Sequence, residues 1–367
     1  MNFSTRVLFS SYFPLIEEEI GLTHSQIGTF LLALGTGYSI MLLISGGVSG
    51  RAGYRNTIVG FMLIAGLTLL LMPSIKSFEA LTVSFFILGL SLGAYLPAAI
   101  PLLTSTSKKL GSTIGIHDSG APIAMIAMPV IAGALLSKFH WSFMIRVIGI
   151  IVITTAIILF AVAENIRGSR TGLRQYLSVI SSPVTHFFSA LWILMAFCGA
   201  GLFSIMPLYL VSERGIPLEQ ALYILGFARI GGLSTPVVGI LSDKLGYRRF
   251  LSLSVSLTGI STLAIPLANK DTLTFVLFVQ AAVTSFFFPM AFVEITRSVD
   301  KDIQSSTIGF VLFMGTLFGL GVLPKVLVEV ADKWNFSTGI ISTGIIVTLL
   351  SVLTLFFGRT FRREDIR

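Results

Sequence analysis

The stretch GILSDKLGYRR at residues 239–249 repeats, in a diverged form, the stretch GGVSGRAGYR at residues 46–55. The two copies start 193 residues apart (46 to 239), and other matches keep nearly the same shift. The tetrapeptide STIG at 112–115 returns at 306–309, and the pair Trp141 and Phe143 returns as Trp334 and Phe336. A shift that stays constant along the chain indicates a duplicated half. This duplication decides the architecture.

Composition places both halves in a membrane. Hydrophobic residues make up 54% of the 367 residues and charged residues only 11%, whereas a soluble domain carries about 25% charged residues. The chain is therefore predicted to be an all-α polytopic membrane protein. Its net charge of +8 is spread over short loops, so no nucleic-acid partner is expected. The single cysteine, Cys198, excludes a disulfide framework and a thiolate metal site, and no cofactor is predicted.

The number of helices follows from the apolar segments, because a helix needs about 20 apolar residues to cross a bilayer. Segments of that kind fall near 27–49, 57–74, 80–103, 113–136, 142–163, 187–210, 220–241, 250–268, 273–296, 306–330 and 338–358. Residues 1–16 form a twelfth segment that is short or truncated. We expect two pseudo-symmetric six-helix bundles, at 1–163 and 186–367, joined by a polar cytoplasmic linker at 164–185.

Basic residues indicate the orientation of these helices. With the amino terminus inside, sixteen Lys and Arg residues fall in inner loops, at 51–55, 108–109, 167–174, 244–249, 297–301 and 359–367. The outer loops hold Lys76, Lys138, Arg214, Lys270 and Lys333. Because short cytoplasmic loops collect Lys and Arg, both termini are predicted to face the cytoplasm. The protein is then a multi-pass protein of the cytoplasmic membrane.

The two repeated stretches resemble the loop signature of the major facilitator superfamily. The second copy is the closer match and contains Gly239, Asp243, Lys244, Gly246, Arg248 and Arg249. The first copy contains Gly46, Arg51, Gly53 and Arg55, but Gly50 stands where the family has an aspartate. The resemblance covers the whole chain and implies the major facilitator fold. It also implies that these loops form latches whose ion pairs break during transport, with the Asp243 copy dominant.

Two arginines lie at membrane depth and are candidates for binding a substrate. Arg229 lies about eleven residues from the outer end of its helix, close to mid-membrane at about 1.5 Å per residue. Because arginine keeps its charge, it needs an anion, an acidic side chain or water beside it. Arg6 has a spacing to Pro14 that resembles superfamily members carrying organic phosphates and other anions. The alternatives are a structural pair with an acid for Arg229 and an inner-surface position for Arg6.

His117 and Asp118 break the duplication, because the second half has Val311 and Leu312 at the matching positions. Histidine changes charge near neutral pH, so the pair is a candidate proton-coupling site. Pro122 supplies the alternative, since it cannot donate to the carbonyl of Asp118 and bends the helix there. In that case both side chains only satisfy loosened backbone.

Aromatic side chains beside matched prolines are candidates for lining the cavity. Tyr95 precedes Pro97 in the first half, and Phe288 precedes Pro289 in the second. We expect both helices to bend near these prolines, and Tyr95 and Phe288 to line or gate the path of a substrate. Packing against lipid or neighbouring helices is the alternative.

Duplicated apolar halves are how secondary transporters surround a central site. The sequence therefore predicts a monomeric secondary transporter that moves a small, anionic solute by alternating access, with proton coupling. Efflux of drug-like compounds is the alternative within the same class. A membrane enzyme acting on lipid-linked substrates is a distant alternative, because His24, His117, His140 and His186 lie in different segments. The substrate, the direction of transport and the coupling ion stay open.

Overall fold

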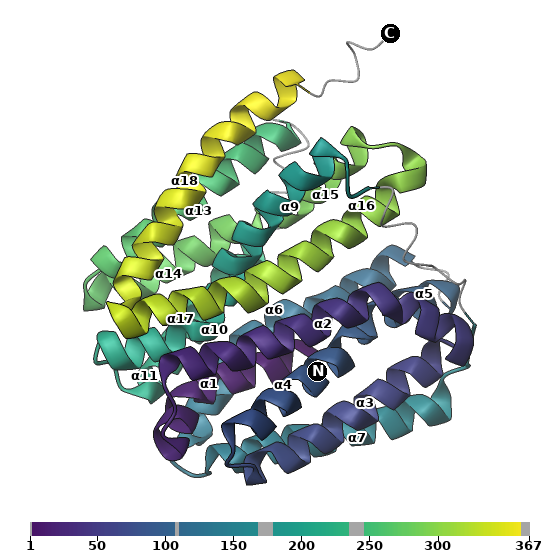
Figure 1. Cartoon of the computed structure of the whole chain (residues 1–367). Coiled ribbons are helices and arrows are strands. Elements are labelled where there is room, and N and C mark those ends of the chain that lie inside the picture. Colours follow the sequence, from purple (N-terminus) through teal and green to yellow (C-terminus); the bar gives the residue numbers. More distant parts are fainter. Residues whose placement is uncertain (1, 107–109, 168–178, 235–245, 361–367) are drawn as a thin grey trace.

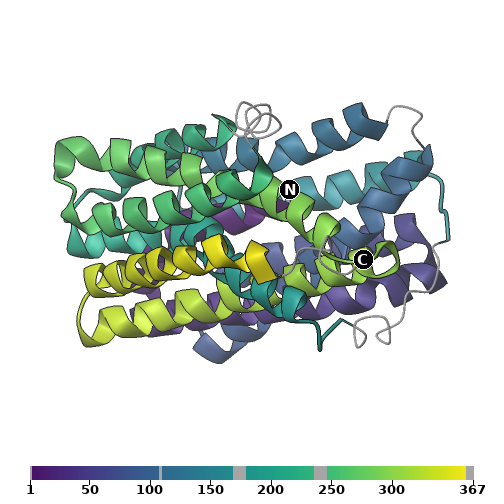
Figure 2. The same ribbon diagram turned by 90° about the horizontal axis from the view of Figure 1, so that it is seen from above.

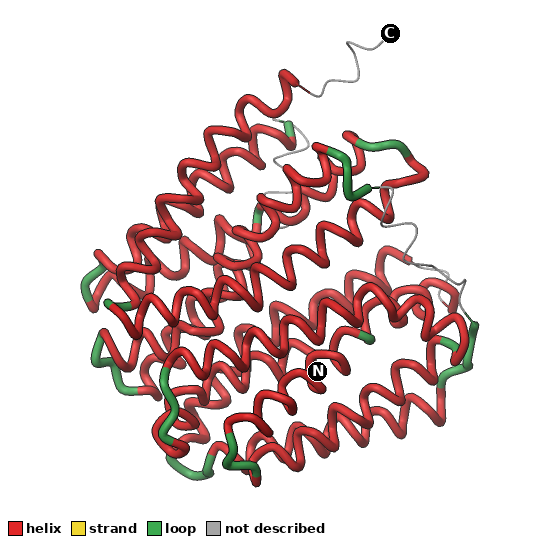
Figure 3. The backbone as a smooth tube through the Cα atoms, viewed as in Figure 1, coloured by secondary structure: helices red, strands yellow, loops and turns green. Residues whose placement is uncertain are grey.

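The computed structural model describes residues 2–106, 110–167, 179–234 and 246–360. Helices and short connections make up all of these residues, and no strand occurs among them (Figure 3). The first half contains α1 (Asn2–Ile20), α2 (His24–Ala52), α3 (Tyr54–Leu71), η1 (Met72–Ser74), α4 (Phe78–Gly93), α5 (Tyr95–Thr106), α6 (Leu110–Leu136) and α7 (Trp141–Val162). The second half contains α9 (Pro183–Ala196), η2 (Phe197–Gly201), α10 (Leu202–Leu208), η3 (Tyr209–Glu213), α11 (Leu218–Arg229), η4 (Ile230–Ser234), α13 (Tyr247–Leu267), α14 (Lys270–Ser285), α15 (Phe287–Ser298), α16 (Lys301–Met314), η5 (Gly315–Val322), α17 (Leu323–Lys333) and α18 (Phe336–Thr360).

Nine helical stretches among the described residues are long and apolar enough to cross a membrane, and each overlaps a predicted segment. They are His24–Ala52, Tyr54–Ser74, Phe78–Ser105, Ile116–Leu136, Trp141–Val162, Pro183–Glu213, Arg249–Leu267, Lys270–Ser298 and Ser306–Lys333. The predicted segment 338–358 lies within α18, and α11 begins the segment 220–241, part of which lies outside the described residues. The count of twelve therefore stays a prediction.

Local sequence determines where several helices begin. At α2 the side chain of Thr23 accepts a hydrogen bond from the backbone N–H of Gln26 at 3.2 Å, and the side chain of Gln26 accepts one from the N–H of Thr23 at 3.0 Å. This reciprocal capping box satisfies two N–H groups that have no partner inside the helix. Asn269 caps α14 through the N–H of Thr272 at 2.9 Å. Both caps lie in the short connections between predicted spans.

The two halves lie side by side and are closest at one end. Figure 1 shows the purple-to-blue first half and the green-to-yellow second half approaching each other near α1, α10, α11 and α17 and diverging toward α5, α15 and α16. Figure 2 shows the molecule from above, where helices of the second half lie in front of those of the first. We call the end with the connections 21–23, 75–77, 137–140, 214–217 and 334–335 the converging end, and the opposite end the diverging end.

Small residues bring the halves together near the converging end. Helix α2 packs against η5 and α17, and α6 packs against α11. A methyl group on Gly35 would lie 2.8 Å from the Cα atom of Gly321. On the other side, a methyl group on Gly226 would overlap the side chain of Val130. Glycine at these positions lets helices approach closely, as is usual in membranes.

Two broken helices match the positions of the repeated prolines. The helix containing Pro97 is interrupted at Ala94, between α4 and α5, and the helix containing Pro289 is interrupted at Phe286, between α14 and α15. Proline has no N–H to bond the carbonyl four residues earlier, so the helix opens just before it. The expected bends at matched depths are therefore confirmed, and they place Tyr95 at the start of α5.

Candidate functional site

Tyr95, His117 and Asp118 form one hydrogen-bonded group in the first half. The Nδ1 atom of His117 lies 2.8 Å from Oδ1 of Asp118, and its Nε2 atom lies 3.0 Å from the hydroxyl of Tyr95. The two rings also stack, with centroids 5.7 Å apart and an interplanar angle of 16°. The His117 side chain is 17% exposed and that of Asp118 is 65% exposed. A titratable imidazole is therefore held between a carboxylate and a phenol.

These three residues line a cavity of about 480 Å³. The polar wall also includes Thr5, Tyr38, Ser91 and Thr155, and the apolar wall includes Phe3, Met62, Leu92, Val152 and Leu159. The volume lies within the range of about 300–1,000 Å³ that is usual for small-molecule sites. Among the described residues, this lining holds a single carboxylate and no Lys or Arg. The sequence analysis predicted that Tyr95 lines a cavity, but it did not predict the bond to His117.

Arg6 lies on α1 beside this cavity. Its guanidinium is 5.9 Å from the ring centroid of Phe3 and 5.5 Å from that of Tyr38, and both rings line the cavity. No acidic side chain in the described part of the chain forms an ion pair with Arg6. Cation–π contacts of this kind hold an arginine without neutralising its charge. The positive charge is therefore available near the cavity wall.

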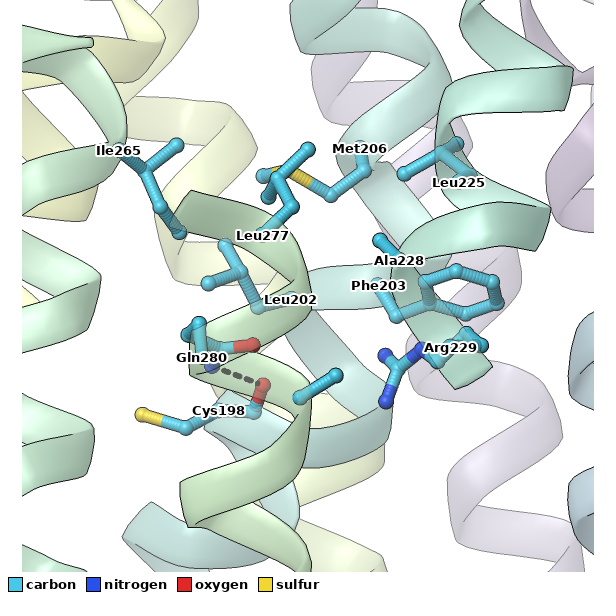
Figure 4. Close-up of a pocket in the computed structure, with 11 residues that line it drawn as sticks. Cys198, Leu202, Phe203, Met206, Leu225, Ala228, Arg229, Ile265, Leu277 and Gln280 are labelled. Atoms are coloured by element: carbon cyan, nitrogen blue, oxygen red, sulfur yellow. Dashed lines mark hydrogen bonds between the residues drawn. The ribbon is translucent and has the colours of Figure 1, made fainter. Parts of the chain in front are cut away.

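Arg229 lies at the end of α11, in the second half. Its guanidinium donates a hydrogen bond to the carbonyl of Gly199 and lies over the ring of Phe203, 3.9 Å from the centroid. Figure 4 shows it beside a small cavity of about 20 Å³, lined mainly by apolar side chains. Among the described residues no acid pairs with Arg229, so the alternative of a structural ion pair finds no partner there.

The carbonyl that Arg229 contacts belongs to a π-helical turn. Residues Phe197–Gly201 form η2, which widens the helix between α9 and α10. The side chain of Gln280, which is 4% exposed, donates to the neighbouring carbonyl of Cys198 at 2.9 Å (Figure 4). Such turns are frequent at functional sites. Gln280 was not predicted from the sequence, because a lone glutamine in an apolar segment carries no pattern.

Phe288 does not line either of these cavities. It packs with Trp192 and Phe287 in an aromatic cluster, with ring centroids 5.3 Å and 5.5 Å away. It also lies next to Gly199, where an added methyl group would be 3.7 Å from its ring. Phe288 therefore borders the π-helical turn that Arg229 contacts, and it lies apart from Tyr95, its match in the repeat.

The first loop copy forms contacts within its own half. Gly53 has φ +87°, a conformation that favours glycine. Arg55 donates to the carbonyl of Ala163 at 3.1 Å and lies 4.6 Å from the ring centroid of Phe160 on α7. Arg51 is exposed, and Gly46 accepts a weak bond from Ser49 at 3.4 Å. Arg55 thus ties the loop to a neighbouring helix end.

The second loop copy is only partly described. Gly239, Asp243 and Lys244 lie outside the described residues, and the side chain of Arg248 is not described either. Gly246 has φ +98°, so it repeats the conformation of Gly53. Arg249 is exposed. The latch role of both loops stays a prediction.

A polar network that the sequence analysis missed joins the halves at the converging end. The ammonium of Lys325 donates to the backbone carbonyl of Ser25 at 2.7 Å and also contacts its hydroxyl. Asp332 accepts a hydrogen bond from the N–H of Ser25 at 2.8 Å. Lys325 also forms an ion pair with Glu329, one turn later on the same helix, at 3.0 Å. Lys325 therefore contacts both an acid on its own helix and the backbone of the opposite half.

Comparisons with known proteins identify the family and the fold. The sequence profile described as Major Facilitator Superfamily matches residues 1–322 and, in a second match, residues 226–366. A "Probable sulfoacetate transporter SauU" of Cupriavidus necator is 26% identical, in a match that covers 66% of this chain. The match spans 62% of that relative's length, less than two thirds.

Two further similarities cover nearly the whole chain. A "Hexuronate transporter" of Bacillus subtilis is 24% identical, in a match that covers 98% of this chain and 92% of that protein. Among solved structures, a bacterial homolog to the human lysosomal transporter Spinster has a TM-score of 0.79 at 17% identity, covering 98% of this chain and 94% of that chain. At that identity the structural likeness concerns the fold.

Proposed function

The chain belongs to the major facilitator superfamily, and on that premise we propose that it carries a small organic anion across the cytoplasmic membrane by alternating access, coupled to protons. The proposal rests chiefly on the 480 Å³ cavity and on the His117–Asp118 pair in its wall. With a neutral imidazole, the negative charge of Asp118 in the described lining offsets the positive charge of Arg6 beside it. A proton on His117 cancels the charge of Asp118 and leaves that of Arg6, so proton binding and anion binding favour each other.

The named relatives support an anionic substrate. Sulfoacetate and hexuronate, in the names of the two similar transporters, are small organic acids. Arg6 beside the cavity and Arg229 in the second half supply positive charge from both halves. We propose that they contact the anion at different stages of the cycle. In the present conformation Arg229 is bound to Gly199 and Phe203, so it must leave them to reach a substrate.

The orientation follows from the charge pattern of the loops. We propose that both termini face the cytoplasm, because the basic loops then lie inside. The converging end then faces outward and is closed by the contacts of Ser25 with Lys325 and Asp332. We also propose that residues 1–163 and 186–367 move as two bodies about the linker 164–185, as in other repeat-built transporters.

A ligand-stabilisation screen of the purified protein in detergent tests the function. The panel is benzoate, glucuronate, sulfoacetate and inorganic phosphate, with a cationic and a neutral drug-like compound as comparison. A ligand at a hundred times its Kd adds about 2.7 kcal/mol to the stability, enough to raise the Tm measurably. Stabilisation by an anion, stronger at pH 6 than at pH 8, is expected. Stabilisation by the cationic or neutral compound alone would overturn the proposal of an anionic substrate and favour efflux of drug-like compounds.

A further inference from the structure

The stacked rings of Tyr95 and His117 stand between two cavities of the first half. Both residues line the 480 Å³ cavity, and both also line a second cavity of about 390 Å³, together with Ala99, Leu102 and Thr113. The rings are nearly parallel, with an interplanar angle of 16°. The Tyr95–His117 pair is therefore a wall shared by the two cavities. A change in its hydrogen bonds changes the polar groups that the wall presents to the larger cavity.

The geometry determines which atom carries which hydrogen. An ionised carboxylate can only accept hydrogen bonds, so Asp118 requires the hydrogen of His117 on Nδ1, at 2.8 Å. In a neutral imidazole the Nε2 atom is then an acceptor. The Tyr95 hydroxyl, 3.0 Å away, must donate to it. While His117 is neutral, the one hydrogen that Tyr95 can donate is used inside the wall.

Protonation of His117 reverses this bond. Both ring nitrogens of an imidazolium are donors, so Nε2 now donates and the Tyr95 oxygen accepts. The hydroxyl hydrogen of Tyr95 must then point elsewhere, and Tyr95 lines the larger cavity. One proton thus adds a positive charge to the wall and frees a hydrogen-bond donor beside it.

Other groups near α6 do not duplicate this role. The elements packed against α6 carry these titratable or charged residues: Arg6, Tyr12, Glu17, Glu18 and Glu19 on α1, Tyr95 on α5, and Glu219, Tyr223 and Arg229 on α11. Tyr38 of α2 also lines the larger cavity. Within the described part of the chain, Tyr95 is the one of these that bonds His117. Glu219 lies toward the converging end, near Gly133.

We infer that the Tyr95 hydroxyl is a proton-dependent donor, which binds the oxyanion of a singly charged organic acid in the larger cavity only when His117 is protonated. This inference rests on the proposed function and gives its coupling a mechanism. A single negative charge is favoured because protonated His117 offsets Asp118 and leaves the positive charge of Arg6 beside the cavity. The hydroxyl hydrogen can rotate about the C–O bond without any movement of the ring. Tyr95 can therefore respond to the protonation of His117 while the two rings stay stacked.

The test is the affinity of the purified full chain at pH 6 and pH 8 for benzoate and glucuronate, which carry one negative charge, and for sulfoacetate, which carries two. Tyr95→Phe keeps the stacked ring and removes only the hydroxyl. We expect it to weaken binding about tenfold at pH 6, the worth of one hydrogen bond, and to leave binding at pH 8 unchanged. Thr155→Val, which removes another hydroxyl from the lining of the same cavity, should weaken both affinities by the same factor.

The outcomes separate this inference from the proposed function. An equal loss at both pH values in Tyr95→Phe would make Tyr95 an ordinary ligand and overturn the inference. No loss at either pH would overturn it as well. In both cases the proposed function would stand, provided the native protein binds one of the three acids more tightly at pH 6. Failure of the native protein to bind any of them would overturn the proposed function itself. His117→Gln should remove the difference between the two pH values.

Discussion

At the scale of single residues, Arg229 combines a fixed charge with weak local partners. Its guanidinium contacts the carbonyl of Gly199 and the aromatic face of Phe203. Guanidinium groups form two parallel hydrogen bonds with a carboxylate, so an anion would be a stronger partner than either. The position of Arg229 in this conformation is therefore a resting position, from which we propose that it moves to the substrate.

We expect Arg229→Ala to abolish saturable anion binding, while Arg229→Lys restores it only partly because the two-pronged donor is lost. Titration with the stabilising anion of the panel measures both. The variants should lose about 1–2 kcal/mol of stability, from one hydrogen bond and one cation–π contact. If Arg229→Ala binds the anion as tightly as the native protein, the Arg229 side chain only hydrogen-bonds the π-helical turn and does not bind substrate.

Asp118 can be tested separately from His117. In Asp118→Asn the carboxamide oxygen can still accept the hydrogen bond from Nδ1 of His117, but the negative charge of the carboxylate is gone. We expect transport into proteoliposomes to become independent of an imposed pH gradient, while exchange of anion for anion continues. The control is Ser119→Ala, which changes the next residue, outside the hydrogen-bonded group of Tyr95, His117 and Asp118. A pH dependence that is unchanged in Asp118→Asn would falsify the proton-site hypothesis.

At the scale of helices and their connections, the loop at Gly53 depends on a glycine. A side chain there would meet both a positive φ and the side chain of Asn165, which donates to the carbonyl of Ala52 at 2.9 Å. We expect Gly53→Ala to destabilise the protein by about 1–3 kcal/mol. Gly47→Ala is the matched control, because its methyl group meets nothing within 4 Å and helical alanine is favourable. Thermal unfolding of both variants measures the difference, and equal Tm values would show that the loop tolerates a side chain.

The end of α1 is joined to two other connections through Glu19. Its carboxylate lies 2.5 Å from Nζ of Lys76 and 2.5 Å from Nε1 of Trp141, and 3.1 Å from Nε2 of His140. The bond to Lys76, followed by that to Trp141, lowers the pKa of Glu19 below 4.5. These contacts tie the first helix to the starts of α4 and α7 at the converging end.

The lowered pKa of Glu19 predicts how stability depends on pH. The stabilisation is complete above about pH 4.5 and is lost as the pH falls through the lower pKa of the folded protein. Glu19→Gln should therefore lower the Tm at pH 7 and reduce the difference in Tm between pH 7 and pH 3.5. Glu18→Gln, on the exposed side of the same turn, is the control. An identical pH profile in Glu19→Gln and the native protein would contradict the assignment.

At the scale of the whole molecule, the contact between Lys325 and Ser25 holds the halves together. We expect Lys325→Met to favour separation at the converging end, since a hydrogen bond to a charged group is worth about 1.5–3 kcal/mol, or roughly 10- to 150-fold in the equilibrium between closed and open forms. Lys270→Met, an exposed lysine at the same end, is the control.

The readout is maleimide labelling of a cysteine placed at Leu222, with Cys198→Ala in the background. Leu222 is fully buried, and its Cβ lies 3.4 Å from where a methyl group on Gly133 of the other half would stand. Labelling should be faster in Lys325→Met than in the native protein or in Lys270→Met. Equal rates in all three would mean that the apolar contacts close this end by themselves.

The sequence by itself determined the class, the family resemblance, the duplicated halves and the helix breaks. Each of these depends on local chemistry: apolar length, a constant repeat, and prolines that cannot donate. It also placed His117 beside Asp118, because adjacent residues need no fold to meet. The total of twelve helices and the roles of the site residues stay predictions.

Only the tertiary structure decided which distant side chains meet. Tyr95 bonds His117 across 22 residues, and Lys325 bonds Ser25 across 300. It likewise placed Arg229 on Phe203 and the carbonyl of Gly199, and Phe288 away from the larger cavity. The physical reason is that lipid-facing and protein-facing surfaces of a membrane helix are both apolar. The hydrophobic pattern therefore does not fix how each helix is rotated about its axis, and that rotation is set by close packing at glycines such as Gly35 and Gly226.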